Sequence, residues 1–172
     1  MTDAPARDFD SRAFRDALGC FATGVTLVTT VDRQGRSIAV TVNSFSSVSL
    51  EPPLVLFSLA RSASNFEDFV SAENFAINVL SREQQHLSAN YARSGESLLQ
   101  PDTHVLGRHG GPLIGGALAH FECHRHATYD GGDHIIFLGE VRSIALRDGG
   151  KPLLYFRGRY GDVADPDVSS SA

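Results

Sequence analysis

Residues 24–42 read GVTLVTTVDRQGRSIAVTV, and this stretch predicts a β-hairpin. β-Branched side chains dominate residues 24–31 and recur in residues 37–42, and such side chains favour extended strands. Residues 32–35, between the two runs, are polar and end in glycine, which is typical of a turn. The two strands are therefore expected to pair antiparallel.

The rest of the chain continues this strand-rich pattern. Two short apolar runs are typical of buried strands, and two longer runs flank the glycine-rich turn DGGD at residues 130–133. A final aromatic run predicts one more strand. The further strands are expected at residues 54–59, 75–80, 117–129, 134–146 and 151–160.

Three short helices are also expected, each after a residue that can cap a helix. The expected caps are Ser11 for the first helix, Ser62 or Ser64 for the second, and Ser81, in a capping box with Gln84, for the third at residues 82–93. The helices do not alternate regularly with the strands, which argues against a doubly wound parallel sheet. The pattern predicts a mainly β fold, an antiparallel barrel with a few short helices.

The length of 172 residues fits one domain with a substantial core. We expect this domain at residues 11–162, a flexible N-terminal arm at residues 1–10 and a disordered tail at residues 163–172. Residues 94–111 are rich in Gly, Ser and His and are expected to be irregular. A loop of this length in a compact domain is often functional.

The chain carries 20 acidic and 15 basic side chains, a formal net charge of −5. This balance argues against broad nucleic-acid or membrane-surface binding, which needs a basic field. No stretch approaches the roughly 18 apolar residues of a membrane span. Cys20 and Cys123 are too few and too far apart for a disulfide framework. A soluble, cytoplasmic protein is therefore expected.

Several familiar motifs are missing. No G-x-G-x-x-G joins a strand to a helix, and no P-loop occurs, so any nucleotide must bind by other means. The nucleophile elbow G-x-S-x-G and the zinc motif H-E-x-x-H are also absent. Cys123 should face away from His124 and His126 on a strand, since alternate residues share a face. No metal site is expected there.

A polar segment, residues 41–49 (TVNSFSSVS), lies within the β region. Hydroxyl and amide side chains are costly inside a barrel unless they find hydrogen-bond partners. The edge of a flavin ring would offer such partners. A serine-rich loop that caps its own turns is the alternative.

Residues 60–65 (ARSASN) connect a strand to a helix. An arginine, two serines and a helix N-terminus can together bind a phosphate. The alternative is a simple helix cap beside a solvated Arg61.

Two further stretches contain candidate ligand contacts. His134 leaves the glycine-rich turn and could contact a nicotinamide, or it could be an ordinary surface residue of a hairpin. Residues 152–160 (PLLYFRGRY), which include Tyr155, could hold an adenine or a flavin edge by stacking. An edge strand covered by its own long side chains is the alternative.

Taken in order, these stretches resemble the short-chain flavin reductase family, whose members are flavin-binding split barrels. The resemblance covers roughly residues 12–162. The matching segments are FATGVTLVT at 21–29, TVNSFSSVSLEPPLV at 41–55, NFAINVL at 74–80, GDH at 132–134 and PLLYF at 152–156.

The resemblance implies a homodimeric split β-barrel that reduces FMN or FAD with NADH or NADPH. The reduced flavin would supply a separate flavin-dependent monooxygenase. The implied flavin contacts are Thr41, Asn43, Ser44, Ser46 and Ser47, with Arg61, Ser62 and Ser64 at the phosphate end. The same resemblance implies that His134 contacts the nicotinamide nucleotide, and Tyr155 is the stacking candidate of the last strand.

Two other classes of function remain open from the sequence. A related split barrel could keep its flavin and reduce another acceptor, such as a corrinoid or a metal complex. A flavin-binding module without turnover could serve as an electron carrier or a sensor. In the reductase that the resemblance implies, hydride transfer from a nicotinamide to a flavin needs no side-chain base, which agrees with the absence of a catalytic dyad.

Overall fold

The structure, a computed structural model, describes residues 8–93 and 95–163. Most of the arm predicted at residues 1–10 and of the tail predicted at 163–172 lies outside the described residues. The elements run in the order α1 (Ser11–Leu18), β1 (Thr23–Gly24), β2 (Thr26–Val31), β3 (Ser37–Val42), β4 (Ser46–Leu50), β5 (Pro53–Ala60), α2 (Phe66–Ser71), β6 (Asn74–Val79), a 3-10 turn (Arg82–Gln84), α3 (Gln85–Tyr91), a second 3-10 turn (Pro101–Thr103), β7 (His104–Leu106), β8 (Pro112–Ile114), β9 (Ala119–Gly131), β10 (His134–Leu146), β11 (Leu154–Phe156) and β12 (Arg159–Gly161).

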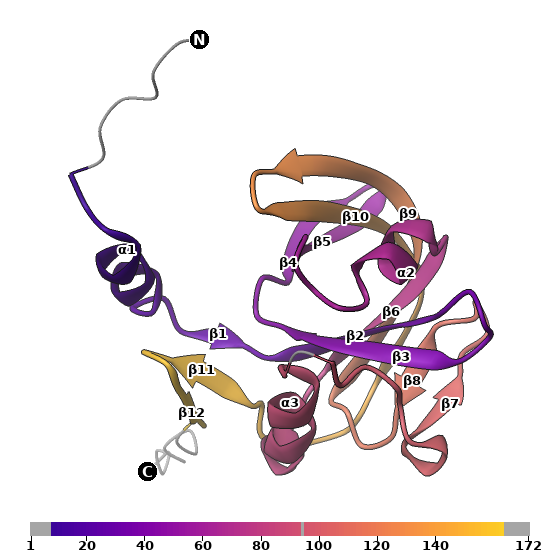
Figure 1. The fold of residues 1–172 in the computed structure, drawn as a ribbon. Coiled ribbons are helices and arrows are strands. Elements are labelled where there is room, and N and C mark those ends of the chain that lie inside the picture. The colour runs from indigo at the N-terminus through magenta and orange to yellow at the C-terminus, as the bar shows by residue number, and fades with distance from the viewer. Residues whose placement is uncertain (1–7, 94, 164–172) are drawn as a thin grey trace, which may run out of the picture.

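The main sheet of the described chain has seven antiparallel strands in the order β3-β2-β6-β9-β10-β5-β4 (Figure 1). Its two edge strands, β3 and β4, are consecutive in the chain and are joined only by residues 43–45. The sheet must therefore curl until its edges approach each other. Ser44 ties this connection to β5, because its hydroxyl accepts from the N–H of Ser58 at 2.9 Å and donates to the carbonyl of Ser58 at 3.2 Å. The predicted mainly β, antiparallel split barrel is confirmed.

Both predicted hairpins are present. β2 pairs with β3 along its whole length, and Asp32 closes the turn between them. One carboxylate oxygen of Asp32 accepts the N–H groups of Gln34 and Arg36, each at 2.8 Å. β9 and β10 pair over 13 residues each and end in a loop of two residues, Gly132 and Asp133. Local turn chemistry therefore sets the register at the start of each hairpin, and in β9–β10 the register shifts further along, between Leu138 and Gly139 and between Val141 and Ser143.

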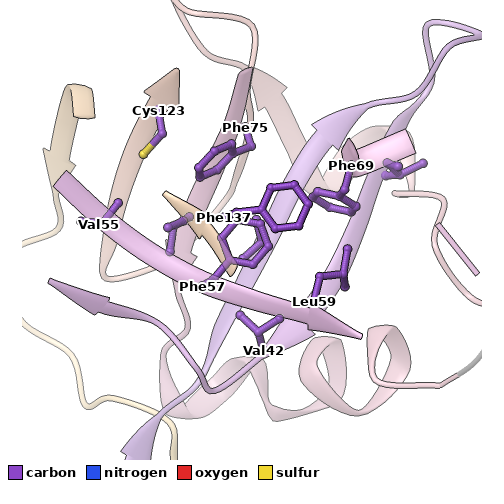
Figure 2. Close-up of a cluster of buried hydrophobic side chains, with 11 residues drawn as sticks. Val42, Val55, Phe57, Leu59, Phe69, Phe75, Cys123 and Phe137 are labelled. Atoms are coloured by element: carbon purple, nitrogen blue, oxygen red, sulfur yellow. The ribbon is translucent and has the colours of Figure 1, made fainter. Parts of the chain in front are cut away.

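Aromatic side chains fill the barrel (Figure 2). Phe57 stacks on Phe137 with ring centroids 4.9 Å apart, and it meets Phe75 edge-on at 5.2 Å. Such pairs favour a well-ordered core beyond the area that they bury. A second cluster, which includes Tyr91 of α3, packs the helix against the sheet; its fully buried members include Leu27, Leu80, Ile114 and Leu153.

The capping prediction for the first helix is wrong by one residue. Asp10, rather than Ser11, caps α1, and its carboxylate accepts the N–H of Ala13 at 2.7 Å. The capping box of Ser81 and Gln84 is confirmed. The helix that follows starts as a 3-10 turn and ends at Tyr91, short of the predicted end at residue 93.

The prediction that Ser62 or Ser64 caps the second helix is also wrong. α2 follows Asn65, and no side chain caps it. The Ser64 hydroxyl instead accepts the N–H of Gly95 at 3.3 Å, so it is directed toward the segment after α3. The buried Asn65 amide donates to the carbonyl of Ala39 at 3.0 Å and fastens the start of α2 to β3.

Two segments contain more structure than predicted. Residues 94–111, predicted to be irregular, include a 3-10 turn and β7. Residues 151–160 form two short strands instead of one, because Arg157 and Gly158 turn the chain with φ values of 46° and 76°. Two positive φ values at adjacent positions are typical of a type I′ hairpin turn. β11 pairs with β1, and Figure 1 shows this small sheet beside α1, away from the barrel.

In the part of the chain that the structure describes, every helix lacks the length and apolarity of a bilayer-crossing segment.

Candidate functional site

A cavity of about 430 Å³ opens where β3, the end of β5, the connection to α2 and the end of α3 meet. This volume lies in the range of small-molecule sites. Segments that are far apart in the sequence contribute to its wall. The lining includes six residues predicted from the sequence: Thr41, Asn43, Ser44, Ser62, Ser64 and His134.

The β3 side of the cavity is held rigidly by its own hydrogen bonds. The Thr41 hydroxyl donates to the carbonyl of Ser88 in α3 at 2.9 Å. The Ser44 hydroxyl is bonded to the backbone of Ser58, as described above. The exposed Asn43 amide has no hydrogen-bond partner among the described residues. This side therefore offers a ligand fixed hydroxyl oxygens and one free amide.

The connection between β5 and α2 forms the opposite wall. The carbonyl of Ala60 accepts the N–H of Ala63 at 3.0 Å, which turns the chain so that Ser62 is exposed at the cavity. The Ser64 hydroxyl accepts the N–H of Gly95, next to the lining residue Glu96. Both serines are exposed residues of the cavity lining, so they could contact an anionic group of a ligand.

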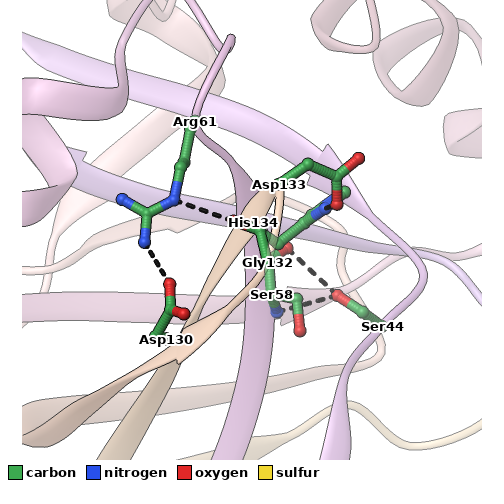
Figure 3. Close-up of polar contacts among 7 residues, drawn as sticks. All are labelled: Ser44, Ser58, Arg61, Asp130, Gly132, Asp133 and His134. Atoms are coloured by element: carbon green, nitrogen blue, oxygen red, sulfur yellow. Dashed lines mark hydrogen bonds and ion pairs between the residues drawn. The ribbon is translucent and has the colours of Figure 1, made fainter. Parts of the chain in front are cut away.

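Arg61 is not part of the cavity lining, although its neighbours Ala60 and Ser62 are. Figure 3 shows its side chain directed at the loop between β9 and β10. The Arg61 Nε group donates to the carbonyl of Gly132 at 3.0 Å, and Nη2 forms an ion pair with the carboxylate of Asp130. The groups that the Arg61 side chain contacts in the structure are thus Gly132 and Asp130 of the protein itself. A contact between Arg61 and a phosphate stays a prediction.

His134 is the first residue of β10, and it lies opposite Ala60 of β5 in the sheet register. Its Nδ1 atom is 2.7 Å from Oδ1 of Asp133. A carboxylate only accepts hydrogen bonds, so Nδ1 carries the proton and Nε2 remains available to a ligand. The hydrogen bond and the charge of His134 lower the pKa of Asp133, so this carboxyl stays ionised near neutral pH.

Besides Arg61, three other predicted residues lie outside this cavity. Ser46 and Ser47 are exposed on the edge strand β4, and the Ser46 hydroxyl donates to the carbonyl of Ser47 at 3.2 Å. Tyr155 lines a second hollow of about 620 Å³ between α1 and the β11–β12 hairpin. Asn43 lines both hollows, so the two are neighbours. Flavin contacts by these three residues remain predictions.

The sequence did not point to several residues of the cavity wall. Arg93 and Glu96 line it from the segment after α3, and Asn65 lines it from the start of α2. The length of the segment after residue 93 was a signal for a functional loop, but it did not single out these side chains. Asn65 belongs to the stretch at residues 60–65, but nothing in the sequence singled out its side chain, because a polar residue before a helix is usually only a cap.

The residues tested for a metal site have other roles. Cys123 is buried in the aromatic core, and this burial, with a smaller contribution from Glu122, raises the pKa of its thiol to about 12. His124 points elsewhere, with Nδ1 3.0 Å from the amide oxygen of Asn74. The described residues contain no cluster of three or more side chains that could hold a metal ion.

Comparison with known families gives a match over most of the chain. Residues 18–164 match the model of the flavin reductase like domain. The FMN reductase (NADH) SmoA of Agrobacterium fabrum is 50% identical over 152 residues, which is 88% of this chain and 86% of SmoA.

The reductase component of the flavin-dependent trigonelline monooxygenase of Acinetobacter baylyi is 41% identical over 162 residues. That alignment covers 93% of this chain but 52% of the relative, so the chain spans about half the length of that protein. Among solved structures, the NADH:FAD oxidoreductase SgcE6 of Streptomyces globisporus, in complex with NAD and FAD fragments, has a TM-score of 0.83 and 39% identity. The structural match covers 96% of this chain and 99% of SgcE6.

Proposed function

The chain belongs to the flavin reductase-like domain family, and on this premise we propose that it is an NAD(P)H:flavin oxidoreductase. It reduces FMN or FAD and supplies the reduced flavin to a partner flavin-dependent monooxygenase. The domain that does this is residues 11–162. The observation that carries the proposal is the single cavity on which Thr41, Asn43, Ser44, Ser62, Ser64 and His134 converge.

The residues of this cavity fit a flavin. One wall presents the Thr41 and Ser44 hydroxyl oxygens and the free Asn43 amide, which match the mixed donors and acceptors of a flavin edge. Ser62 and Ser64 lie at the mouth, where a phosphate group would meet hydroxyl donors. The apolar part of the lining includes Leu59. The cavity therefore combines apolar surface with many polar groups, and placed polar groups fix the orientation of a ligand in such a site.

When bound, a flavin would supply the group that takes a hydride from the nicotinamide of NADH or NADPH. The protein's task would be to hold the two rings at close range, and no side-chain base is needed for this. The fixed hydroxyl and amide groups at the cavity would stabilise charge at the edge of the flavin. His134, with Nδ1 held by Asp133, presents Nε2 to the nicotinamide nucleotide.

The alternatives from the sequence have less support. A protein that keeps its flavin for a corrinoid or metal complex, or a passive flavin carrier, would not be expected to be 50% identical over 152 residues to an FMN reductase that uses NADH. A location in the cytoplasm agrees with the two free cysteines, since disulfides are rare there.

We also infer a homodimer. No residue of α1 is buried, and Phe14, Leu18 and Phe21 are 51%, 58% and 79% exposed. Leu18 and Phe21 border the second hollow, next to Tyr155. A second subunit that covers this apolar face would bury it and enclose the ligand site. Sedimentation at micromolar concentration should show a dimer, and a monomer with full flavin reductase activity would contradict this inference.

Steady-state turnover with FMN and FAD, each with NADH and NADPH, tests the proposed function. We expect turnover with at least one pair. Absence of turnover with all four pairs, in a protein that binds flavin, would refute the flavin reductase and leave the two alternatives, a flavoprotein that reduces another acceptor and a passive carrier.

A further inference from the structure

The loop that carries His134 into place is short and exposed. Gly132 and Asp133 are its two central residues, and Gly132 has a φ of 78°. A glycine with positive φ at the first position is typical of a type II′ turn. Both residues are exposed, so the position of the loop depends on what ties it to the barrel.

Arg61 supplies that tie through its backbone and its side chain (Figure 3). Its N–H donates to the carbonyl of Asp133 at 2.9 Å, and its Nε group donates to the carbonyl of Gly132 at 3.0 Å. Nη2 pairs with Asp130, the residue two before the loop. A planar guanidinium can make such contacts together because its donors are fixed relative to one another.

The loop in turn orients the histidine ring. Asp133 follows Gly132 in the chain, and the Gly132 carbonyl accepts a hydrogen bond from the Arg61 side chain. The Asp133 carboxylate accepts a hydrogen bond from Nδ1 of His134 at 2.7 Å. His134 is next in the chain and lines the cavity. A connected path therefore runs from the Arg61 side chain, through the loop, to the ring that faces the ligand.

We propose that Arg61 and Asp130 form a clasp that positions His134 for the nicotinamide nucleotide. Arg61 is thus a positioning residue rather than the phosphate ligand predicted from the sequence. The inference rests on the proposed function, because it assigns the clasp a role in nicotinamide use. The clasp also joins the wall that holds Ser62 to the loop that holds His134.

The exposure of the clasp makes it separable from stability. The side chains of Arg61 and Asp130 are 45% and 77% exposed, and exposed ion pairs contribute little to folding. Loss of the clasp should leave the thermal midpoint nearly unchanged. It should act on the loop alone, and through the loop on the KM for NADH or on the rate of hydride transfer.

The test compares Arg61→Met and Asp130→Asn with the parent. Flavin affinity is measured by fluorescence quenching, and NADH kinetics by steady-state and stopped-flow assays. Each variant should lose about fivefold in kcat/KM for NADH, while the flavin Kd stays within about twofold. The double variant should lose no more than Arg61→Met alone, since Arg61→Met already removes both side-chain contacts of Arg61 with Gly132 and Asp130.

Two further variants sharpen the comparison. In a His134→Ala background, Arg61→Met should have no additional effect on NADH kinetics, because there is no ring to position. Arg33→Met is the matched control. Arg33 is an exposed arginine in the turn between β2 and β3, and it forms an ion pair with Glu67 of α2 at 3.8 Å. The Arg33→Met variant should change neither NADH kinetics nor flavin affinity.

The phosphate-ligand role gives a different pattern. Arg61→Met would then weaken flavin binding with the KM for NADH unchanged, and Asp130→Asn would be silent; this result would overturn the clasp. Normal NADH kinetics in both single variants would overturn it as well. A parent protein that never reduces flavin would instead refute the proposed function, and the clasp with it.

Discussion

Replacement of Gly139 by alanine tests the packing that positions β10, the strand that begins with His134. A Cβ atom at Gly139 would lie closer to Phe75 Cζ than van der Waals contact allows, and only 3.0 Å from the Cβ of Cys123. The Phe75 ring cannot easily yield, because it is 2% exposed and packs edge-on against Phe57 at 5.2 Å. The added methyl group must therefore strain the core.

The size of the effect follows from two opposing contributions. Overpacking a core costs about 1–3 kcal/mol. The lower entropy of the unfolded alanine chain returns about 0.4–1 kcal/mol. The free energy of unfolding should fall by about 1–2 kcal/mol, which lowers the Tm by about 2–8 °C in a chain of this size.

The assay is thermal unfolding at one fixed protein concentration, with Gly161→Ala as the control. Gly161 also lies in a strand, but a Cβ there would meet nothing within 4 Å. The control should keep or slightly raise the Tm. If Gly139→Ala raised the Tm as much as the control, the close packing of β10 against Phe75 would be refuted.

Three other predictions follow from the site and the core. His134→Ala should lower kcat/KM for NAD(P)H about tenfold to a hundredfold, roughly 1.4–2.7 kcal/mol, at constant flavin affinity; unchanged kinetics below KM would make His134 an ordinary surface residue. Burial lowers the pKa of His120 below its ordinary value of 6.5, so the unfolded state binds the extra proton. Neutral His120 therefore makes its full contribution to stability above pH 6.5. The free energy of unfolding, measured by urea titration, should decrease as the pH falls below 6.5, and His120→Gln should flatten this dependence. A thiol reagent should label Cys123 only after denaturation, because the side chain is buried and burial raises the pKa of its thiol to about 12; rapid labelling of Cys123 in the native protein would contradict the buried core.

Strong local signals made much of the fold predictable. β2, β3, β9 and β10 are long and carry their turn residues between them, so sequence alone located them. β1, with two residues, and β7, with three, have no such pattern. β1 exists because a strand far along the chain, β11, pairs with it, so it depends on tertiary structure. β7 pairs with its neighbour β8, and a strand of three residues is too short to show an alternating pattern.

The candidate site shows the same division. One cavity is lined by Thr41, Asn43, Ser44, Ser62, Ser64 and His134, and their contacts with flavin and nicotinamide stay predictions. Arg61 was predicted to line the same site, but its side chain contacts Gly132 and Asp130 at the end of the β9–β10 hairpin. The direction of a side chain cannot be read from the residue type. Arg93 and Glu96 enter the wall only because α3 ends at Tyr91 beside the opening.

Anaerobic stopped-flow mixing of the flavin-loaded protein with NADH or NADPH tests the central claim most directly. A reductase predicts rapid loss of the visible absorbance of the flavin, at a rate that saturates with the nicotinamide nucleotide. Bleaching no faster than that of free flavin under the same conditions would contradict the account.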